Sequence, residues 1–323
     1  MAGKGRIMAA TTAVRDRTRT AEVPYPEGAA YVDGAYVPIA EAKIPILDWG
    51  FLRSDCTYDV VHVWGGRFFR LDHHLDRFTN NVEALRLELP YPREEITEIL
   101  MRLMRLTGLR EAYVELICTR GAPPKGSRDP RRCENRFYAF VIPFLWIATE
   151  EQRERGLHLH VSAIPRIPPQ SVSPRIKNFH WGDMNRALFE AFEAGCDLPV
   201  LVDLDGKISE GPGFNVFMVK EGTVITPEGT CLDGITRQTA LDLLAEQNHE
   251  VVIGAFAPDE LRAADEAFIT STAGGIVPVT RVDHRLLGDG EPGPVTTRLK
   301  SLYWQRHDDG REGTPIDYGS AER

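Results

Sequence analysis

The stretch "PRIKNFHWGD", residues 174–183, decides how the chain is interpreted. It contains Lys177, one of seven lysines in 323 residues. Lys177 follows an isoleucine and precedes an aromatic-rich run, Phe179, His180 and Trp181. A lysine ammonium group is usually solvated, so a lysine among residues that tend to be buried needs a reason. In apolar surroundings a lysine loses its proton more readily and becomes a nucleophilic amine.

Three other motifs in the second half supply groups that such an amine would need. A nucleophilic lysine forms Schiff bases with aldehydes, and pyridoxal phosphate is the commonest biological partner of this kind. Glu210, in "SEGPGFN", could face the pyridine nitrogen of that cofactor. Ile235 and Thr236, in "DGITR", could bind its phosphate at the start of a predicted helix. Taken singly, these features are also explained as a surface lysine, a polar loop residue, a helix cap and, in "TSTAGG", a flexible turn after a strand.

Composition and charge exclude several other classes of protein. Hydrophobic residues make up 42% and charged residues 26% of the chain, which is the balance of a globular protein. A net charge of −9 argues against nucleic acid as a partner, because phosphate binding needs a basic surface. No apolar run approaches the ~20 residues of a membrane span, so no membrane partner is expected. The five cysteines are scattered without a C-x-x-C pair, which predicts no disulfide framework or metal site and suits a reducing cytoplasm.

Changes in composition along the chain predict two α+β domains. Residues 1–29 are Arg-, Thr- and Ala-rich and predict a disordered tail, with a mitochondrial presequence as the alternative. A small N-terminal domain is expected over 30–147 and a large C-terminal domain over 157–323. The polar stretch 148–156 is the expected linker. Strands and helices occur in blocks, so a Rossmann sheet of alternating βαβ units is not expected.

Individual elements follow from turn signals and apolar spacing. The dipeptides at 33–34 and 65–66 each separate two apolar runs, which predicts two hairpins with two-residue turns. One helix is expected to begin with Asp72 as its N-cap, and a second, over 93–107, to end at Gly108. Further helices are expected over 183–194, 236–247 and 258–264, with strands between them.

The order of the motifs resembles a known enzyme family. A lysine is followed by a glutamate with G-x-G-F-N, then by G-I-T-R, and then by T-A-G-G. This order is similar to the large-domain signature of the fold-type IV pyridoxal-phosphate enzymes, and the resemblance runs from about residue 30 to the end of the chain. The family includes branched-chain aminotransferases, D-amino-acid aminotransferases, aminodeoxychorismate lyases and (R)-selective amine transaminases. The resemblance implies a two-domain α+β fold and a homodimer whose sites lie at the domain boundary.

The resemblance also implies a role for each cofactor-site residue. Lys177 resembles the lysine that holds pyridoxal phosphate as an internal aldimine and moves a proton during transamination. Glu210 resembles the carboxylate that faces the pyridine nitrogen, and Arg77, in "LDHHLDRF", resembles the arginine that binds the phosphate. Without the motif, Arg77 would be an ordinary exposed helix arginine. The remaining cofactor-binding residues that the resemblance implies are Phe214, Asn215, Ile235, Thr236 and Thr272.

The first domain indicates which member of the family the chain resembles most. Branched-chain enzymes carry an aromatic-x-arginine pattern in the strand before the "TRG" turn, whereas this chain has Tyr113-Val114-Glu115. A glutamate there cannot bind a substrate carboxylate directly, because like charges repel. Arg53 with Tyr58, in "RSDCTYDVV", matches the (R)-selective amine transaminases, as do "KNFHWGD" and "STAGG". The resemblance therefore implies ping-pong exchange between an (R)-amine and a 2-oxo acid such as pyruvate.

Such an enzyme must accept an amine without a carboxylate and a 2-oxo acid that has one. Lys125 and Arg128 lie on the loop "TRGAPPKGSRDPRR" and could bind that carboxylate, or they could be ordinary solvated charges. The expected pocket walls, which in the sequence look the same as core residues, are Tyr58, Val60, Tyr113 and Trp181. The alternative functions are a branched-chain or D-amino-acid aminotransferase, an aminodeoxychorismate-type lyase and a non-catalytic protein of the same fold. The complete set of cofactor-site residues argues against the last.

Overall fold

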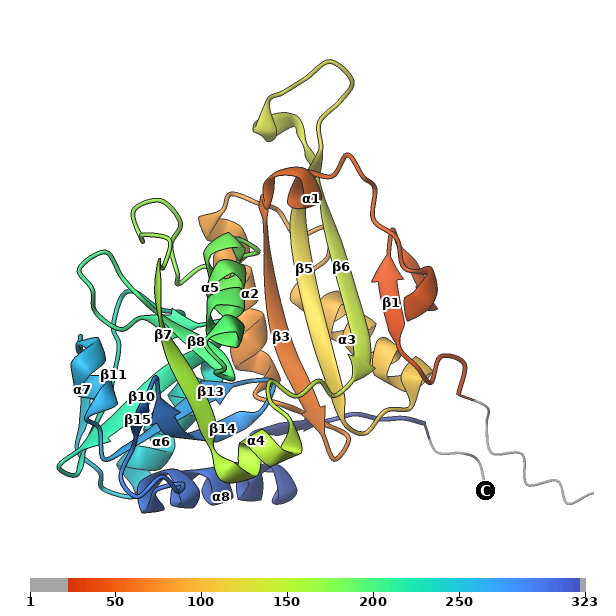
Figure 1. The fold of residues 1–323 in the computed structure, drawn as a ribbon. Helices are drawn as coiled ribbons and strands as arrows, with labels where there is room; N and C mark the ends of the chain where they lie inside the picture. The colour runs from red at the N-terminus through yellow and green to blue at the C-terminus, as the bar shows by residue number, and fades with distance from the viewer. Residues whose placement is uncertain (1–22, 320–323) are drawn as a thin grey trace, which may run out of the picture.

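The structure, a computed structural model, describes residues 23–319 and contains two β-sheets with helices packed against them (Figure 1). Most of the tail expected over 1–29 lies outside the described residues. Its described end is attached to the protein, because the backbone N–H of Tyr25 donates to the carbonyl of Leu106 at 3.0 Å. Within 23–319, no helix combines the length and the apolarity that crossing a bilayer requires.

The first sheet has seven strands in the order β16-β4-β3-β5-β6-β1-β2, and every pair in it is antiparallel. Both predicted hairpins are confirmed, and their turns at 33–34 and 65–66 have positive φ at all four residues. Such turns match the right-handed twist of the paired strands. The strands are β1 (Ala29–Val32), β2 (Ala35–Pro38), β3 (Cys56–Trp64), β4 (Arg67–Phe69), β5 (Ala112–Ala122), β6 (Glu134–Pro143) and β16 (Gly313–Pro315).

Two amphipathic helices, α2 (Leu71–Ala84) and α3 (Arg93–Thr107), bury their apolar faces in the core of the first domain. The second helix ends at Gly108, as predicted. The prediction that Asp72 is the N-cap of the first helix is wrong. Arg70 occupies the cap position with φ 52°, and the Asp72 carboxylate instead accepts a hydrogen bond from Arg93 at 3.0 Å.

The second sheet is mixed and has the main strand order β12-β11-β10-β13-β14-β7-β8. Its parallel pairs are β11 with β12, β14 with β7, and β7 with β8. Helix α5 (Gly182–Glu193) packs on β7 and β8, and α6 (Ile235–Glu246) packs with α8 (Pro294–Asp308) against β13 and β14. The strands are β7 (Leu157–Pro165), β8 (Leu198–Val202), β9 (Glu210–Gly211), β10 (Phe214–Lys220), β11 (Thr223–Thr226), β12 (Val251–Ile253), β13 (Glu266–Ser271), β14 (Gly275–Val282) and β15 (Arg285–Leu286).

The path of the chain differs from the expected division in two places. The expected linker 148–156 contains the short helix α4 (Glu150–Arg155), which begins with a capping box between Thr149 and Gln152. Residues 313–315, expected in the second domain, form β16 and pair with β4 of the first sheet. The chain therefore passes between the two sheets twice. The remaining helices are α1 (Trp49–Arg53) and α7 (Pro258–Arg262).

Candidate active site

A cavity of about 230 Å³ is lined from both domains and collects most of the predicted site residues. Strands β3 and β5 and helix α2 contribute from the first domain. The segment around Lys177, the β9–β10 turn, the start of α6 and the end of β13 contribute from the second. The predicted residues that line the cavity are Tyr58, Val60, Arg77, Tyr113, Lys177, Trp181, Glu210, Phe214, Asn215, Ile235, Thr236 and Thr272.

Lys177 lies in a segment without regular structure, and this segment is attached to strand β3 of the first domain. The carbonyl oxygen of Lys177 accepts hydrogen bonds from the Thr57 hydroxyl at 2.7 Å and from the Tyr58 N–H at 3.3 Å. Its Nζ lies 4.4 Å from the centre of the Tyr58 ring. That ring stacks in turn on Phe179, with ring centres 4.3 Å apart. The amine is therefore held over an aromatic face inside the cavity.

Glu210, on β9, is 4% exposed, and two donors fix its carboxylate. Arg166 Nε donates to Oε1 at 3.0 Å, and the Leu232 N–H donates to Oε2 at 2.9 Å. Arg166 also donates to Asp183 at 2.7 Å, so its own orientation is set from a second side. Burial raises the pKa of the Glu210 carboxyl, although Arg166 and the Leu232 N–H oppose this shift. The result is a buried, oriented carboxyl group in the wall of the cavity.

The N-terminus of α6 opens onto the cavity. Ile235 and Thr236 are its first residues, and N–H groups at a helix start have no carbonyl partner within the helix. These groups and the helix dipole make such an end favourable for a phosphate. Gly234 precedes the helix, and a Cβ there would lie 2.2 Å from Oδ1 of Asn215. Asn215 supports the same turn by donating to the carbonyl of Leu232 at 2.7 Å.

Arg77 reaches the same part of the cavity from helix α2 of the first domain. Its Nε and Nη2 donate to the buried Asp59 at 2.7 and 2.9 Å, and its Nη1 donates to the carbonyl of Asp233 at 3.1 Å. Burial on its own would raise the pKa of Asp59. The Arg77 guanidinium and a 2.7 Å hydrogen bond with His74 outweigh burial and hold that pKa below its usual range. A cation and an open helix N-terminus therefore lie beside one another.

These groups fit pyridoxal phosphate. Arg77 and the start of α6 provide donors for a phosphate, Glu210 provides an acid for a pyridine nitrogen, and Lys177 provides an amine for an aldehyde. One further observation also indicates a ligand. The hydroxyl of Thr270, on β13 in the cavity wall, is buried and has no hydrogen-bond partner within the described part of the chain. A buried polar atom of this kind is satisfied when a ligand or water supplies the missing partner.

Four predicted site residues are not among those that line the cavity. The guanidinium of Arg53 lies 3.4 Å from the centre of the Trp49 ring. Glu115 is buried two residues from Tyr113 on β5, and the Tyr113 hydroxyl donates to it at 3.0 Å. Burial raises the pKa of Glu115 to about 7. Lys125 and Arg128 are exposed on the β5–β6 loop, which projects away from both sheets (Figure 1), so a single chain does not bring them to the cavity.

Sequence reasoning missed a second group of lining residues. Most are apolar or small, and in a sequence such residues look like ordinary core or loop positions. The role of Arg166 could not be predicted from the sequence, because its partners Glu210 and Asp183 are distant in sequence. Gly234 could have been inferred, because it lies within two residues of the predicted helix start and belongs to the quoted motif "DGITR". The missed lining residues are Leu145, Trp146, Ile147, Arg166, Pro174, Ile176, Asn178, Met184, Pro212, Gly213, Leu232, Gly234, Thr270, Ser271 and Ala273.

The site thus has the groups of a pyridoxal-phosphate enzyme, and comparisons with known proteins identify the class. Residues 57–282 match the family model described as amino-transferase class IV. The chain is 32% identical over 276 residues to a putative branched-chain-amino-acid aminotransferase of Methanocaldococcus jannaschii, covering 84% of this chain and 94% of that one. It is 28% identical over 271 residues to the D-alanine aminotransferase of Bacillus licheniformis, covering 83% and 93%.

A solved structure agrees. A crystal structure of a branched-chain amino acid aminotransferase with pyridoxamine 5'-phosphate superposes with a TM-score of 0.83 at 28% identity, covering 90% of this chain and 99% of that one. The chain belongs to the class IV aminotransferases. It is a pyridoxal-phosphate-dependent transaminase, and the fold-type IV architecture predicted from the sequence is confirmed.

Proposed function

We propose that the chain is an (R)-selective amine:2-oxo acid aminotransferase. The proposal rests on one observation: the arginines that line the cavity are already paired with carboxylates of the protein. The arginines among its described lining residues are Arg77 and Arg166, and both are bound to carboxylates. The walls expected to face the substrate are aromatic or apolar: Tyr58, Val60, Tyr113 and Trp181. Such a pocket favours an apolar amine and offers no unpaired guanidinium to the carboxylate of an amino acid.

The cofactor is proposed to lie between the Arg77 side and the Glu210 side of the cavity. When bound, it supplies an electron sink for charge that develops at the substrate carbon. Arg77, Ile235, Thr236 and Thr272 are the proposed phosphate ligands. Glu210, oriented by Arg166 and the Leu232 N–H, would supply the acid for the pyridine nitrogen. Phe214 and Asn215, which line the cavity, would contact the pyridine ring.

Lys177 is the proposed proton carrier. Its amine takes the proton from the substrate carbon as a general base and returns a proton as a general acid. The Tyr58 face and the hydrogen bonds to the Lys177 carbonyl hold the amine on one side of the cavity. Protons are therefore exchanged on one face of the reacting carbon. We assign this face to (R)-amines, in keeping with the resemblance to the (R)-selective enzymes.

We also propose that the enzyme is a cytoplasmic homodimer. Large apolar side chains are exposed before and within α1, where Ile46 is 72%, Leu47 68% and Phe51 61% exposed, and contact with a second copy would cover them. Arg53 lies in the same helix. In a dimer the projecting β5–β6 loop meets a second chain, which gives Lys125 and Arg128 a route to the carboxylate of the 2-oxo acid.

The alternative proposal is a branched-chain or D-amino-acid aminotransferase. The similarity to a putative branched-chain-amino-acid aminotransferase at 32% identity and to a D-alanine aminotransferase at 28% identity supports it. An aminodeoxychorismate-type lyase shares the cofactor site but needs no amine acceptor. The three proposals differ in the substrate end of the cavity, so substrate preference decides between them.

The deciding experiment is a half-reaction without an acceptor, followed by loss of the visible absorption band of the bound cofactor. The substrates are (R)-1-phenylethylamine, its (S) enantiomer, L-leucine and D-alanine. Rapid loss of the band with the (R)-amine, and slow loss with the other three, is the expected result. Faster loss with L-leucine or D-alanine would replace the proposal with the alternative. A protein that acquires no such band from pyridoxal phosphate would refute the placement of the cofactor at Lys177.

A further inference from the structure

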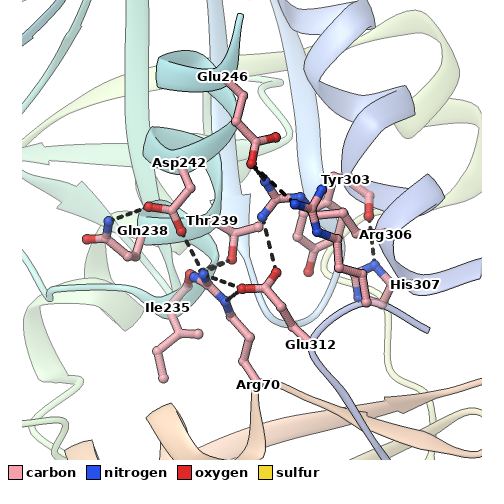
Figure 2. A network of polar contacts seen from close by, with 11 residues as sticks. Arg70, Ile235, Gln238, Thr239, Asp242, Glu246, Tyr303, Arg306, His307 and Glu312 are labelled. Atoms are coloured by element: carbon pink, nitrogen blue, oxygen red, sulfur yellow. Dashed lines mark hydrogen bonds and ion pairs between the residues drawn. The ribbon is translucent and has the colours of Figure 1, made fainter. Parts of the chain in front are cut away.

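Arg70 lies directly before helix α2, and its guanidinium is buried against helix α6 and the C-terminal segment (Figure 2). Its Nη1 donates to the Thr239 hydroxyl at 3.0 Å, and its Nη2 donates to the Asp242 carboxylate at 2.6 Å. Its Nε and Nη2 donate to Oε1 of Glu312 at 2.8 and 2.6 Å. One side chain of the first domain therefore binds two residues of α6 and the segment that leads into β16.

The backbone around this side chain is also constrained. Arg70 has φ 52° and Glu312 has φ 60°, so both partners have left-handed conformations that are unfavourable for residues with a Cβ. The Arg70 N–H donates to the Glu312 carbonyl at 2.9 Å, in addition to the side-chain ion pair. Such conformations persist where the surroundings over-determine them. The geometry of Arg70 is therefore tightly specified.

Both elements that Arg70 joins carry groups of the candidate phosphate site. Helix α2 carries Arg77, about two turns beyond Arg70. Helix α6 begins at Ile235, and the Thr239 hydroxyl that accepts from Arg70 donates to the Ile235 carbonyl at 2.9 Å. Arg77 itself contacts the carbonyl of Asp233, just before α6, at 3.1 Å. The two helices are thus joined at two points, one at Arg70 and one at Arg77. Two contacts fix the angle between α2 and α6, whereas one contact would let the helices rotate about it.

We propose that Arg70 is a positioning residue for the phosphate end of the active site. It holds α2 against α6 so that the Arg77 guanidinium and the N–H groups of Ile235 and Thr236 face one phosphate. Arg70 is not among the residues that line the cavity, so it acts through these groups and not by contact with the cofactor. The inference rests on the phosphate-binding roles assigned under the proposed function.

The test compares two ligands of the apoenzyme: pyridoxal phosphate and pyridoxal, which lacks the phosphate. Dissociation constants are measured by absorbance titration well below the melting temperature. In Arg70→Gln, the dissociation constant for pyridoxal phosphate should rise roughly tenfold or more, whereas that for pyridoxal should change less than about twofold. The preference for the phosphorylated ligand should therefore fall. A purely structural role would lower thermal stability without this selective change.

Arg306→Gln is the matched control. Arg306 is as buried as Arg70, at 5% against 7% exposure, and it binds the same Glu312 at 3.1 Å. Its other ion-pair partner is Glu246, at the far end of α6, 2.7 Å away. It does not join α2 to the start of α6. Arg306→Gln should lower Tm by a similar amount and keep the wild-type preference for pyridoxal phosphate over pyridoxal.

A milder variant covers the case in which Arg70→Gln does not fold. Asp242 has a side chain that is 34% exposed, so Asp242→Asn should fold and should shift the ligand preference in the same direction by a smaller factor. An unchanged preference in the folded Arg70→Gln or Asp242→Asn variant would overturn the proposal, as would an equal loss in Arg306→Gln. A wild-type enzyme that binds both ligands equally would refute the phosphate site itself, and this inference with it. The amine half-reaction tests the substrate assignment separately.

Discussion

The proposed cofactor end and the proposed substrate end of the cavity balance buried charge differently. At the cofactor end, Asp59 binds Arg77 at 2.7 Å and Glu210 binds Arg166 at 3.0 Å. Glu115 is also buried and does not itself line the cavity; its side-chain partner is the neutral hydroxyl of Tyr113, a residue of the proposed substrate end. These ion pairs fix the orientation of Arg77 and Glu210, the residues proposed to bind the charged groups of the cofactor. Burial raises the pKa of Glu115 more than the Tyr113 hydroxyl and the Lys177 ammonium lower it, so its neutral form is favoured, which would suit a pocket for apolar amines.

Replacing Lys177 by alanine has the largest expected effect, because it removes the amine that is proposed both to bind the cofactor and to transfer the substrate proton. The described cavity lining contains no other lysine. Transamination should fall by roughly a thousandfold or more, and the absorption band of the bound cofactor should shift to that of the free aldehyde. Lys220→Ala is the control, since this ammonium pairs with Asp265 at the surface, and its activity should be unchanged. Near-normal activity in Lys177→Ala would place the chemistry elsewhere.

Changing Glu210 to glutamine should have the next largest effect, and it tests the paired end. The amide cannot carry the charge that stabilises a protonated pyridine nitrogen, so kcat should fall by roughly a hundredfold. Glu210 is not among the proposed phosphate ligands, so the dissociation constant for pyridoxal phosphate should change much less. Steady-state kinetics and cofactor titration measure the two quantities, with the exposed Glu150→Gln as control. An equal loss of both would make Glu210 a structural residue of the cofactor site.

The cofactor end was largely predictable from the sequence, because its chemistry needs particular residue types in a particular order. Lys177, Glu210 and the start of α6 belong to motifs that remain legible without the structure, and all of them line one cavity. The hairpins and helix α3 were predictable for a related reason. Turn residues, glycine caps and apolar spacing act over a few neighbouring residues, so the sequence shows them directly.

The substrate end was less predictable, because it depends on contacts between distant parts of the chain. In the sequence, Leu145, Trp146 and Ile147 continue an apolar run that is typical of a strand. Strand β6 ends at Pro143 instead, and the run lines the cavity. The return of 313–315 to the first sheet depends on non-local pairing, for which a short strand gives no local signal. The position of Arg70 at the start of α2 depends on its partners in α6 and the C-terminal segment in the same way.

The buried carboxyl of Glu115, whose side-chain partner is a neutral hydroxyl, predicts a pH dependence. Its pKa is about 7 in the folded protein against an ordinary value of 4.5, so the folded state holds an extra proton between these pH values. The contribution of protonated Glu115 to the free energy of unfolding is fully present below about pH 4.5 and is lost as the pH rises through about 7. As the pH rises from about 5 to 8, the Tm of Glu115→Gln should therefore fall less than the Tm of the wild type. Melting curves across this range, with the exposed Glu83→Gln as control, measure the difference.

The same titration should affect substrate choice. Above about pH 7, the Glu115 carboxylate is charged and should oppose the carboxylate of a 2-oxo acid. The KM for pyruvate should rise several-fold, up to about tenfold, between about pH 6 and 8, whereas the KM for an (R)-amine should not follow it. In Glu115→Gln the KM for pyruvate should stay flat. Parallel pH profiles for both substrates in both proteins would show that Glu115 does not separate the two substrate classes.

The smallest expected effect concerns Lys125 on the projecting β5–β6 loop, because exposed ion pairs are weak. If this ammonium meets the carboxylate of the 2-oxo acid in a homodimer, Lys125→Ala should raise the KM for pyruvate by about threefold and leave the KM for the amine unchanged. The effect should shrink in high salt, since exposed charges are screened. Arg131→Ala is the control on the same loop, because that guanidinium pairs with Asp129 at 2.7 Å. An unchanged KM for pyruvate in Lys125→Ala would mean that the carboxylate is bound inside the cavity, where the arginines are already paired. The carboxylate would then have to bind Arg77 or Arg166, which already pair with carboxylates at the proposed cofactor end. In that case the cofactor end and the substrate end would not differ in how they balance charge.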